Sequence, residues 1–152
     1  MAQNEPAAPP AMFKLMNPII RFLVRNNIGP MSNALMVITH TGRKSGKAYS
    51  IPIGYVRDGD TILAVTLGGR SQWYQNVQQH PEAMLTIKGK PIRARAVLVN
   101  DVDEVARVLD IYKREQAQRY ERFFGVPLTM SADEAARSPQ LRAKYVRFHP
   151  IA

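Results

Sequence analysis

Apolar and polar positions along the first half of the chain predict short β-strands joined by tight turns. A continuous apolar run at Ala34–Thr39 is typical of a buried strand, and two strand-like segments follow at Tyr49–Arg57 and Thr61–Thr66. Asp58-Gly59, between these two segments, is a strong hairpin signal. The pattern therefore predicts an antiparallel sheet built from neighbouring hairpins.

The second half adds another hairpin and a final strand. Ala83–Lys88 and Ile92–Asn100 flank a polar turn, and Lys144–Phe148 has strand-like composition near the end of the chain. Along Ile92–Asn100 small and apolar residues alternate with Arg93 and Arg95, which indicates a strand with one face inside and a basic stretch on the other.

Three segments have helical spacing instead. Ser71–Gln79 places its apolar residues on one side, Asp101 caps a longer helix that runs toward Arg119, and Ser131–Arg137 is a brief helical piece. Five or six antiparallel strands with helices at the ends and one mid-chain predict an α+β, mainly β fold. The expected architecture is a small β-barrel with peripheral helices.

The start of the chain is expected to stand apart from this barrel. Residues 1–11 are rich in proline and alanine and predict a flexible tail, so residues 12–152 form the single domain. Pro18 begins a short amphipathic helix that ends at Gly29. Its apolar residues lie beside three cations, Lys14, Arg21 and Arg25. Two interpretations stay open, a helix packed on the domain and a peripheral membrane contact.

Charge narrows the class of partner. The 152 residues carry a net charge of +9, which favours an anionic partner such as a phosphorylated cofactor, nucleic acid or an acidic membrane. The chain has no cysteine and three dispersed histidines, so we predict no metal site. No apolar run is long enough to span a membrane and the start lacks a basic signal region, so we expect a cytoplasmic protein.

The strongest chemical signal is the run Thr41-Gly42-Arg43-Lys44-Ser45-Gly46-Lys47. The glycines at both ends of this turn permit backbone angles that let amide groups converge, and cations and hydroxyls crowd the same few residues. Converging N–H groups and fixed positive charge suit a phosphate. A solvated hairpin turn with ordinary surface lysines is the alternative that the turn alone leaves open.

Together with later segments, this turn resembles the deazaflavin (coenzyme F-420)-dependent nitroreductase family over residues 18–99. The matching segments, in order, are Thr41-Gly42-Arg43-Lys44-Ser45-Gly46, Pro52, Tyr55-Val56-Arg57-Asp58-Gly59, Gly68-Gly69, Trp73-Tyr74-Gln75-Asn76-Val77 and Pro81. The resemblance implies a split β-barrel, like that of the flavin-dependent pyridoxamine phosphate oxidases. It also implies an oxidoreductase that transfers hydride from the reduced coenzyme to a nitroaromatic, a quinone or an enone.

The resemblance also implies a set of cofactor-binding residues. In this sequence they are Arg43, Lys44 and Ser45 for the phosphate and acidic tail, Ala64, Val65, Thr66, Gly68 and Gly69 along the ring, and Trp73 and Asn76 at its border. Tyrosines after the barrel often line the acceptor pocket in this family. Tyr120 is therefore the candidate catalytic residue, as a proton donor, with a bound water as the alternative, while Tyr112 fits the apolar stripe of its helix.

Two positions depart from the family pattern. Many relatives carry an arginine where this chain has Tyr49, which the resemblance also places among the cofactor-binding residues, and a lysine where it has Leu67. Because two cationic contacts are missing, FMN in place of the deazaflavin, or a cofactor-binding protein without turnover, stays an alternative. Nucleic acid is not the expected partner, because the basic strand at Arg93 and Arg95 has no aromatic residue. Split barrels commonly dimerise, and the sequence leaves a homodimer open.

Overall fold

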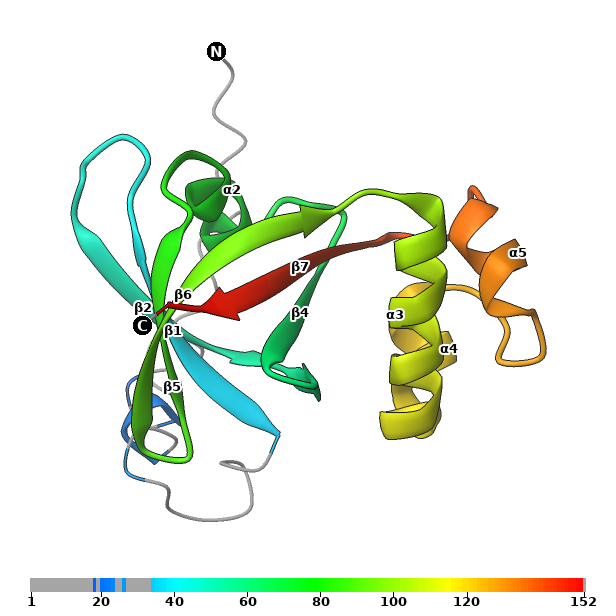
Figure 1. Ribbon diagram of the computed structural model, residues 1–152, viewed down its shortest axis with the longest axis horizontal. Helices are drawn as coiled ribbons and strands as arrows, with labels where there is room; N and C mark the ends of the chain where they lie inside the picture. The colour runs from blue at the N-terminus through cyan, green and yellow to red at the C-terminus, as the bar shows by residue number, and fades with distance from the viewer. Residues whose placement is uncertain (1–17, 19, 24–25, 27–33, 152) are drawn as a thin grey trace.

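The computed structural model describes Pro18, residues 20–23, Asn26 and residues 34–151, and within them seven strands form one antiparallel sheet (Figure 1). The strands are β1 (Leu35–Thr41), β2 (Ala48–Gly54), β3 (Val56–Asp58), β4 (Thr61–Leu67), β5 (Glu82–Ile87), β6 (Lys90–Val99) and β7 (Ala143–Pro150). The labelled helices are α2 (Gln72–Gln79), α3 (Val102–Glu115), α4 (Ala117–Phe124) and α5 (Ala132–Arg137). None of these helices is both long and apolar enough to cross a membrane.

The order of strands across the sheet is β2-β1-β5-β6-β7-β4-β3. The sheet curls until residues of β2, at one end of this order, contact β4 near the other end. The predicted single strand at residues 49–57 is divided at Tyr55, because β2 pairs with β1 whereas β3 pairs with β4. This bend carries the chain from one end of the sheet to the other and leaves the barrel open between β2 and β4.

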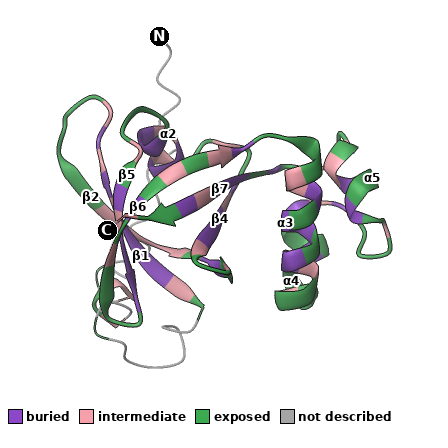
Figure 2. Ribbon diagram, in the orientation of Figure 1, coloured by how far each residue is buried: buried purple, intermediate pink, exposed green. Residues whose placement is uncertain are grey.

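Strand alternation creates two cores, one on each face of the sheet (Figure 2). On β7, Val146 and Phe148 point into the barrel, where Met36 and Trp73 also pack. Tyr145 points to the opposite face and packs in a second core with α3, α4 and α5. Figure 1 shows these three helices together on one side of the barrel.

The sequence-based boundaries change at three places. The predicted helix from Asp101 toward Arg119 is interrupted at Gln116, whose φ of −138° and ψ of 42° end α3 and precede α4. The turn between β5 and β6 contains only two residues, and the last strand is longer than predicted. Pro18 and residues 20–23 are helical as expected, whereas the predicted tail and most of the N-terminal amphipathic segment lie outside the described residues.

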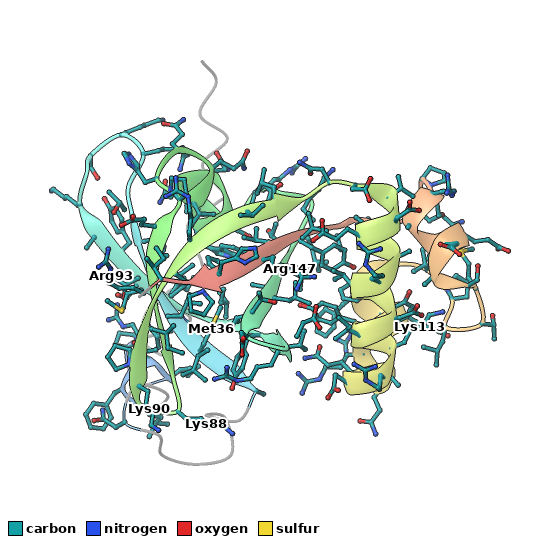
Figure 3. The ribbon with its side chains drawn as sticks, viewed as in Figure 1. Met36, Lys88, Lys90, Arg93, Lys113 and Arg147 are labelled. Atoms are coloured by element: carbon teal, nitrogen blue, oxygen red, sulfur yellow. The ribbon has the colours of Figure 1, made fainter. Side chains whose placement is uncertain are left out.

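Arg147 on β7 ties the helical side to the barrel (Figure 3). Its guanidinium donates to Asp58 Oδ2 at 2.7 Å, to Thr61 Oγ1 at 2.7 Å and to Glu104 Oε1 at 3.2 Å. The side chain of Arg147 is only 14% exposed, so solvent screens these contacts weakly. One residue thus links β7 to the β3–β4 hairpin and to α3.

We expect Arg147→Met to lower the free energy of unfolding by about 2–4 kcal/mol, because two carboxylates lose a charge-assisted partner. The matched control is Arg93→Met, which removes an ion pair with Glu82 whose two side chains are both more than half exposed. That control should cost less than about 1 kcal/mol. Equal losses for the two variants in urea unfolding would contradict the role of Arg147.

Candidate functional site: a cleft at the open side of the barrel

A cleft of about 1090 Å³ opens where the two ends of the sheet approach each other. Its walls come from the turn between β1 and β2, from β2 itself, from the end of β4 and from the start of α2. The apolar part of the lining includes Ile51, Ile53 and Val65, and the charged part is Arg43 and Lys44. The cleft therefore has a cationic end at the turn and apolar walls along the strands.

The cationic turn is closed by two backbone hydrogen bonds. The Gly42 N–H donates to Lys47 O at 2.7 Å, and the Gly46 N–H donates to Gly42 O at 2.9 Å. A Cβ added to Gly42 would lie 2.6 Å from Ser45 Oγ and 2.7 Å from a ring carbon of Tyr49, closer than such atoms pack. Glycine is needed at this position because the turn folds back against its own side chains.

Arg43 is held in place by α2. Its backbone N–H donates to Asn76 Oδ1 at 3.0 Å, and its Nη1 donates to the same oxygen at 2.8 Å and to Gln72 Oε1 at 2.7 Å. Gln72 and Asn76 are four residues apart, so both face the turn from one side of the helix. A single guanidinium nitrogen makes both side-chain contacts, which leaves Nε and Nη2 of Arg43 to hold a ligand.

His40 lies at the buried end of this network. Asn76 uses its oxygen to accept from Arg43, so its Nδ2 is the donor to His40 Nδ1, at 2.9 Å. The imidazole is buried and stacks on the Tyr49 ring with a centroid distance of 6.1 Å. Burial lowers the pKa of His40 to about 4. His40 is therefore neutral, with its proton on Nε2.

His40 was not among the residues predicted from sequence. The signal was present in the β1 segment, where Met36, Ile38 and His40 occur at every second position. Strand alternation places all three on the face that points into the barrel. A polar residue at an inward position of a buried strand needs a polar partner, and Asn76 is that partner here.

Two hydroxyl pairs complete the polar lining. Thr66 Oγ1 at the end of β4 is hydrogen-bonded to Ser71 Oγ, and Ser45 Oγ lies 3.1 Å from the Tyr49 hydroxyl. Ser71 precedes α2 as predicted, but its hydroxyl is bonded to Thr66 and makes no cap to the helix backbone. The hydroxyls of Thr66 and Ser71 line the cleft.

The structure brings most of the predicted cofactor-binding residues to this cleft. Those that line it are Arg43, Lys44, Ser45, Tyr49, Val65, Thr66, Trp73 and Asn76. Ala64 points instead into the barrel core, and Gly68 and Gly69 form the turn between β4 and α2 without lining the cleft. Leu67, the second departure from the family pattern, lines the cleft opposite Tyr49 and is 46% exposed.

Tyr120 lies elsewhere. Its side chain is buried in the core between the sheet and α3–α5, beside Phe124, and it is not among the residues that line the cleft. Burial, with a smaller contribution from Asp110, raises the pKa of Tyr120 to about 12. Burial also raises the pKa values of Tyr112 and Tyr145 in the same core. The catalytic role of Tyr120 stays a prediction, and its position argues against it.

Among the residues that the structure describes, no three His, Cys, Asp or Glu side chains gather closely enough to hold a metal ion. The cleft instead offers an arginine, a lysine, hydroxyls and apolar walls. Such a donor set suits an organic ligand with an anionic part and a planar, weakly polar part.

Two solved structures of known proteins have the same fold as this chain. A structure from Listeria innocua, named as a pyridoxamine 5'-phosphate oxidase, superposes with a TM-score of 0.55 at 14% identity, covering 94% of this chain and 95% of that one. A structure named as an F420-H2 dependent reductase gives a TM-score of 0.53 at 19% identity, over 74% of this chain and 93% of that one. These likenesses confirm the predicted split-barrel fold.

The family follows from the sequence itself. The model of the F420H(2)-dependent quinone reductase family matches residues 22–134, so the chain belongs to that family. The match confirms the predicted deazaflavin-dependent family, which is named for a quinone reductase activity and for reduced coenzyme F-420.

A Mycobacterium tuberculosis protein named as an F420H(2)-dependent quinone reductase is 32% identical over 77 residues, which cover 48% of this chain. The chain matches 64% of the length of that curated relative.

The pH dependence of stability tests the His40 environment. The unfolded chain binds a proton at His40 near pH 6.5, whereas the folded chain binds it near pH 4. Between these values the unfolded state holds more protons, so the free energy of unfolding falls as the pH falls, by up to about 3 kcal/mol. We expect His40→Gln to remove this component, because Gln has no titrating group and its oxygen accepts from Asn76. The free energy of unfolding is measured in urea from pH 7 to 4.5 for the parent and for His40→Gln. An equal dependence on pH in the two proteins would contradict this prediction.

The position of Tyr120 gives a second prediction. Because its hydroxyl lies in the helix-side core, we expect Tyr120→Phe to leave coenzyme affinity and turnover within about twofold of the parent. Asn76→Leu is the comparison variant, since it changes a residue that lines the cleft. A large fall in turnover of Tyr120→Phe with unchanged coenzyme binding would restore Tyr120 as the proton donor.

Proposed function

We infer that this protein binds reduced F-420 in the cleft and transfers a hydride from it to a quinone. The observation that carries the proposal is Arg43, fixed by Gln72 and Asn76 at one end of a cleft with apolar walls. Membership of the quinone reductase family favours a quinone among the acceptors expected from the sequence.

The cationic end suits the phosphate and acidic tail of the coenzyme. Arg43 keeps two guanidinium nitrogens for a ligand, and the neighbouring Lys44 is exposed at the same turn. Because Arg43 is already oriented by α2, little side-chain freedom is lost when an anion binds. Each charge-assisted contact of this kind contributes roughly 1.5–3 kcal/mol to binding.

The backbone edge of β4 at the open side of the barrel can hydrogen-bond the polar edge of a planar ring. The β3–β4 ladder ends at the pair Val56 and Leu63, so residues 64–67 have no partner strand on that side within the described part of the chain. The Gly68 N–H donates to Arg142 O, beside β7. Since backbone groups alternate along a strand, those of Val65 and Leu67 face away from β7, toward the open side of the barrel.

The chain's own residues hold the reactants and orient them in the cleft. When bound, the reduced coenzyme supplies the hydride, and the quinone takes up a proton from solvent at the open mouth. Val65, Ile51 and Ile53 provide apolar walls against which a ring packs. Trp73 is 4% exposed and packs on Phe148, so it closes the base of the cleft.

Tyr49 and Leu67 lie at the rim of the coenzyme cleft. They lie on opposite strands, β2 and β4, and are 47% and 46% exposed. Where many relatives place cations, this chain thus presents Tyr49 and Leu67. The anionic part of the coenzyme then depends on Arg43 and Lys44, the two cations that line the cleft in the described part of the chain. FMN, which also carries a phosphate, is the alternative ligand of the same cleft. The homodimer and the peripheral membrane contact, which the sequence left open, stay predictions.

The proposal is tested by titration, using the fluorescence of Trp73, the one tryptophan of the chain. We expect saturable quenching by F-420, with affinity reduced about tenfold or more in Arg43→Gln and less in Lys44→Gln. Arg95→Gln, which removes an exposed cation outside the cleft, is the matched control and should bind normally. Oxidation of reduced F-420 by a soluble quinone then measures turnover.

Three results would change the assignment. Tighter binding of FMN would make this a flavin-binding protein. Binding of F-420 without quinone reduction would leave a coenzyme carrier. Equal affinities in Arg43→Gln and the parent would remove the turn from the site.

A further inference from the structure

A second cavity, of about 760 Å³, lies between the barrel and the helices on the far side of the β2–β3 bend. It shares no lining residue with the coenzyme cleft. Its walls come from β3, from the β5–β6 turn and from the junction of α3 and α4. Four cations line it, Arg57, Lys88, Arg114 and Arg119, and we refer to this cavity as the basic groove.

The positive charge of the basic groove is poorly neutralised. Glu115 is its one lining carboxylate, and it pairs with Arg114 through side chains that are more than half exposed. Such a surface pair stabilises little. Within residues 34–151, no ion pair is found for Arg57, Lys88 or Arg119, and the nearby Asp58 is bonded to Arg147. Four cations and one anion leave a net charge of +3 around one opening.

Lys88 has a positive φ, a backbone conformation that Gly and Asn adopt more readily than lysine. Lys88 and Gly89 form the two-residue turn between β5 and β6, with φ values of 49° and 78°. A turn with positive φ at both positions prefers Asn or Gly at the first, and a lysine there costs about 1 kcal/mol. Figure 3 shows Lys88 at the end of the β5–β6 hairpin. The hairpin explains the backbone but not the choice of lysine, whose side chain lines the basic groove.

The break between α3 and α4 supplies the opposite wall. In a straight helix, Arg114 and Arg119 would point about 140° apart, since five residues turn the helix by that angle. The non-helical Gln116 interrupts the helix between them, and both side chains line the same groove. Three separate backbone features, a strand, a strained turn and a helix break, thus bring cations to one place.

We propose that the basic groove binds an oligoanion with several phosphate groups close together, separately from the coenzyme cleft. In a cavity of this volume a single phosphate would contact the cations of only one wall, whereas linked phosphates reach the cations of both walls. Such groups are available as a free oligophosphate or as the headgroups of an anionic lipid surface, and the two sources share the same chemistry.

The test is calorimetric titration of the full chain with tripolyphosphate and with orthophosphate. We expect tripolyphosphate to bind more tightly than orthophosphate, and its affinity to fall as salt is added. Arg119→Gln and Lys88→Gly should each weaken it about tenfold. Arg95→Gln and Arg43→Gln should leave it unchanged, because neither residue lines the basic groove.

Lys88→Gly separates binding from folding. Glycine fits a positive φ, so this variant should raise the melting temperature while it weakens anion binding. Loss of binding in Arg43→Gln, but not in Lys88→Gly, would place the anion in the coenzyme cleft and overturn the proposal. If Arg95→Gln lost as much tripolyphosphate affinity as Lys88→Gly, binding would depend on net charge and not on the basic groove, and the proposal would again be overturned.

Sedimentation with vesicles distinguishes the two sources. Vesicles of phosphatidylcholine with and without phosphatidylglycerol are compared for the parent and for Lys88→Gly. Binding that needs phosphatidylglycerol and weakens in the variant supports a lipid headgroup as the source. Equal vesicle binding by both proteins, with tripolyphosphate affinity lost only in the variant, supports a free oligophosphate.

Discussion

The side-chain amide of Asn76 is the contact on which the cleft depends. Its oxygen accepts two hydrogen bonds from Arg43, one from the backbone and one from the guanidinium, and its nitrogen donates to His40. An amide has one accepting and one donating end, so each contact fixes the orientation needed for the other. Because Asn76 is only 3% exposed, loss of any partner leaves a buried polar group without a hydrogen bond.

This contact lies at a cleft because the barrel is open between β2 and β4. The bend at Tyr55 moves the chain from the β1 ladder to the β4 ladder, so β2 and β4 become facing edges of an open barrel. Helix α2 follows β4 directly and lies against β1, which brings Asn76 to the turn that carries Arg43. The cationic turn, the free strand edge and the helix then surround one cleft.

Local pattern predicted much of this arrangement. Apolar runs and turn residues located the strands, and the glycine-bounded cationic turn was recognisable before its surroundings were known. What local pattern does not contain is the pairing of distant strands. The division of one predicted strand at Tyr55 depends on partners in β1 and β4, and the burial of Tyr120 depends on how α4 packs on the sheet. His40 was overlooked because its partner, Asn76, lies 36 residues away.

The most direct test of the account is a double-mutant cycle between Arg43 and Asn76, measured as the dissociation constant of F-420. If Asn76 acts by holding Arg43, then Asn76→Ala and Arg43→Ala each weaken binding. The double variant should then be little worse than Arg43→Ala alone, which gives a coupling of about 1 kcal/mol or more. Strictly additive losses would contradict the account, because Asn76 would then contribute to coenzyme binding without acting through Arg43.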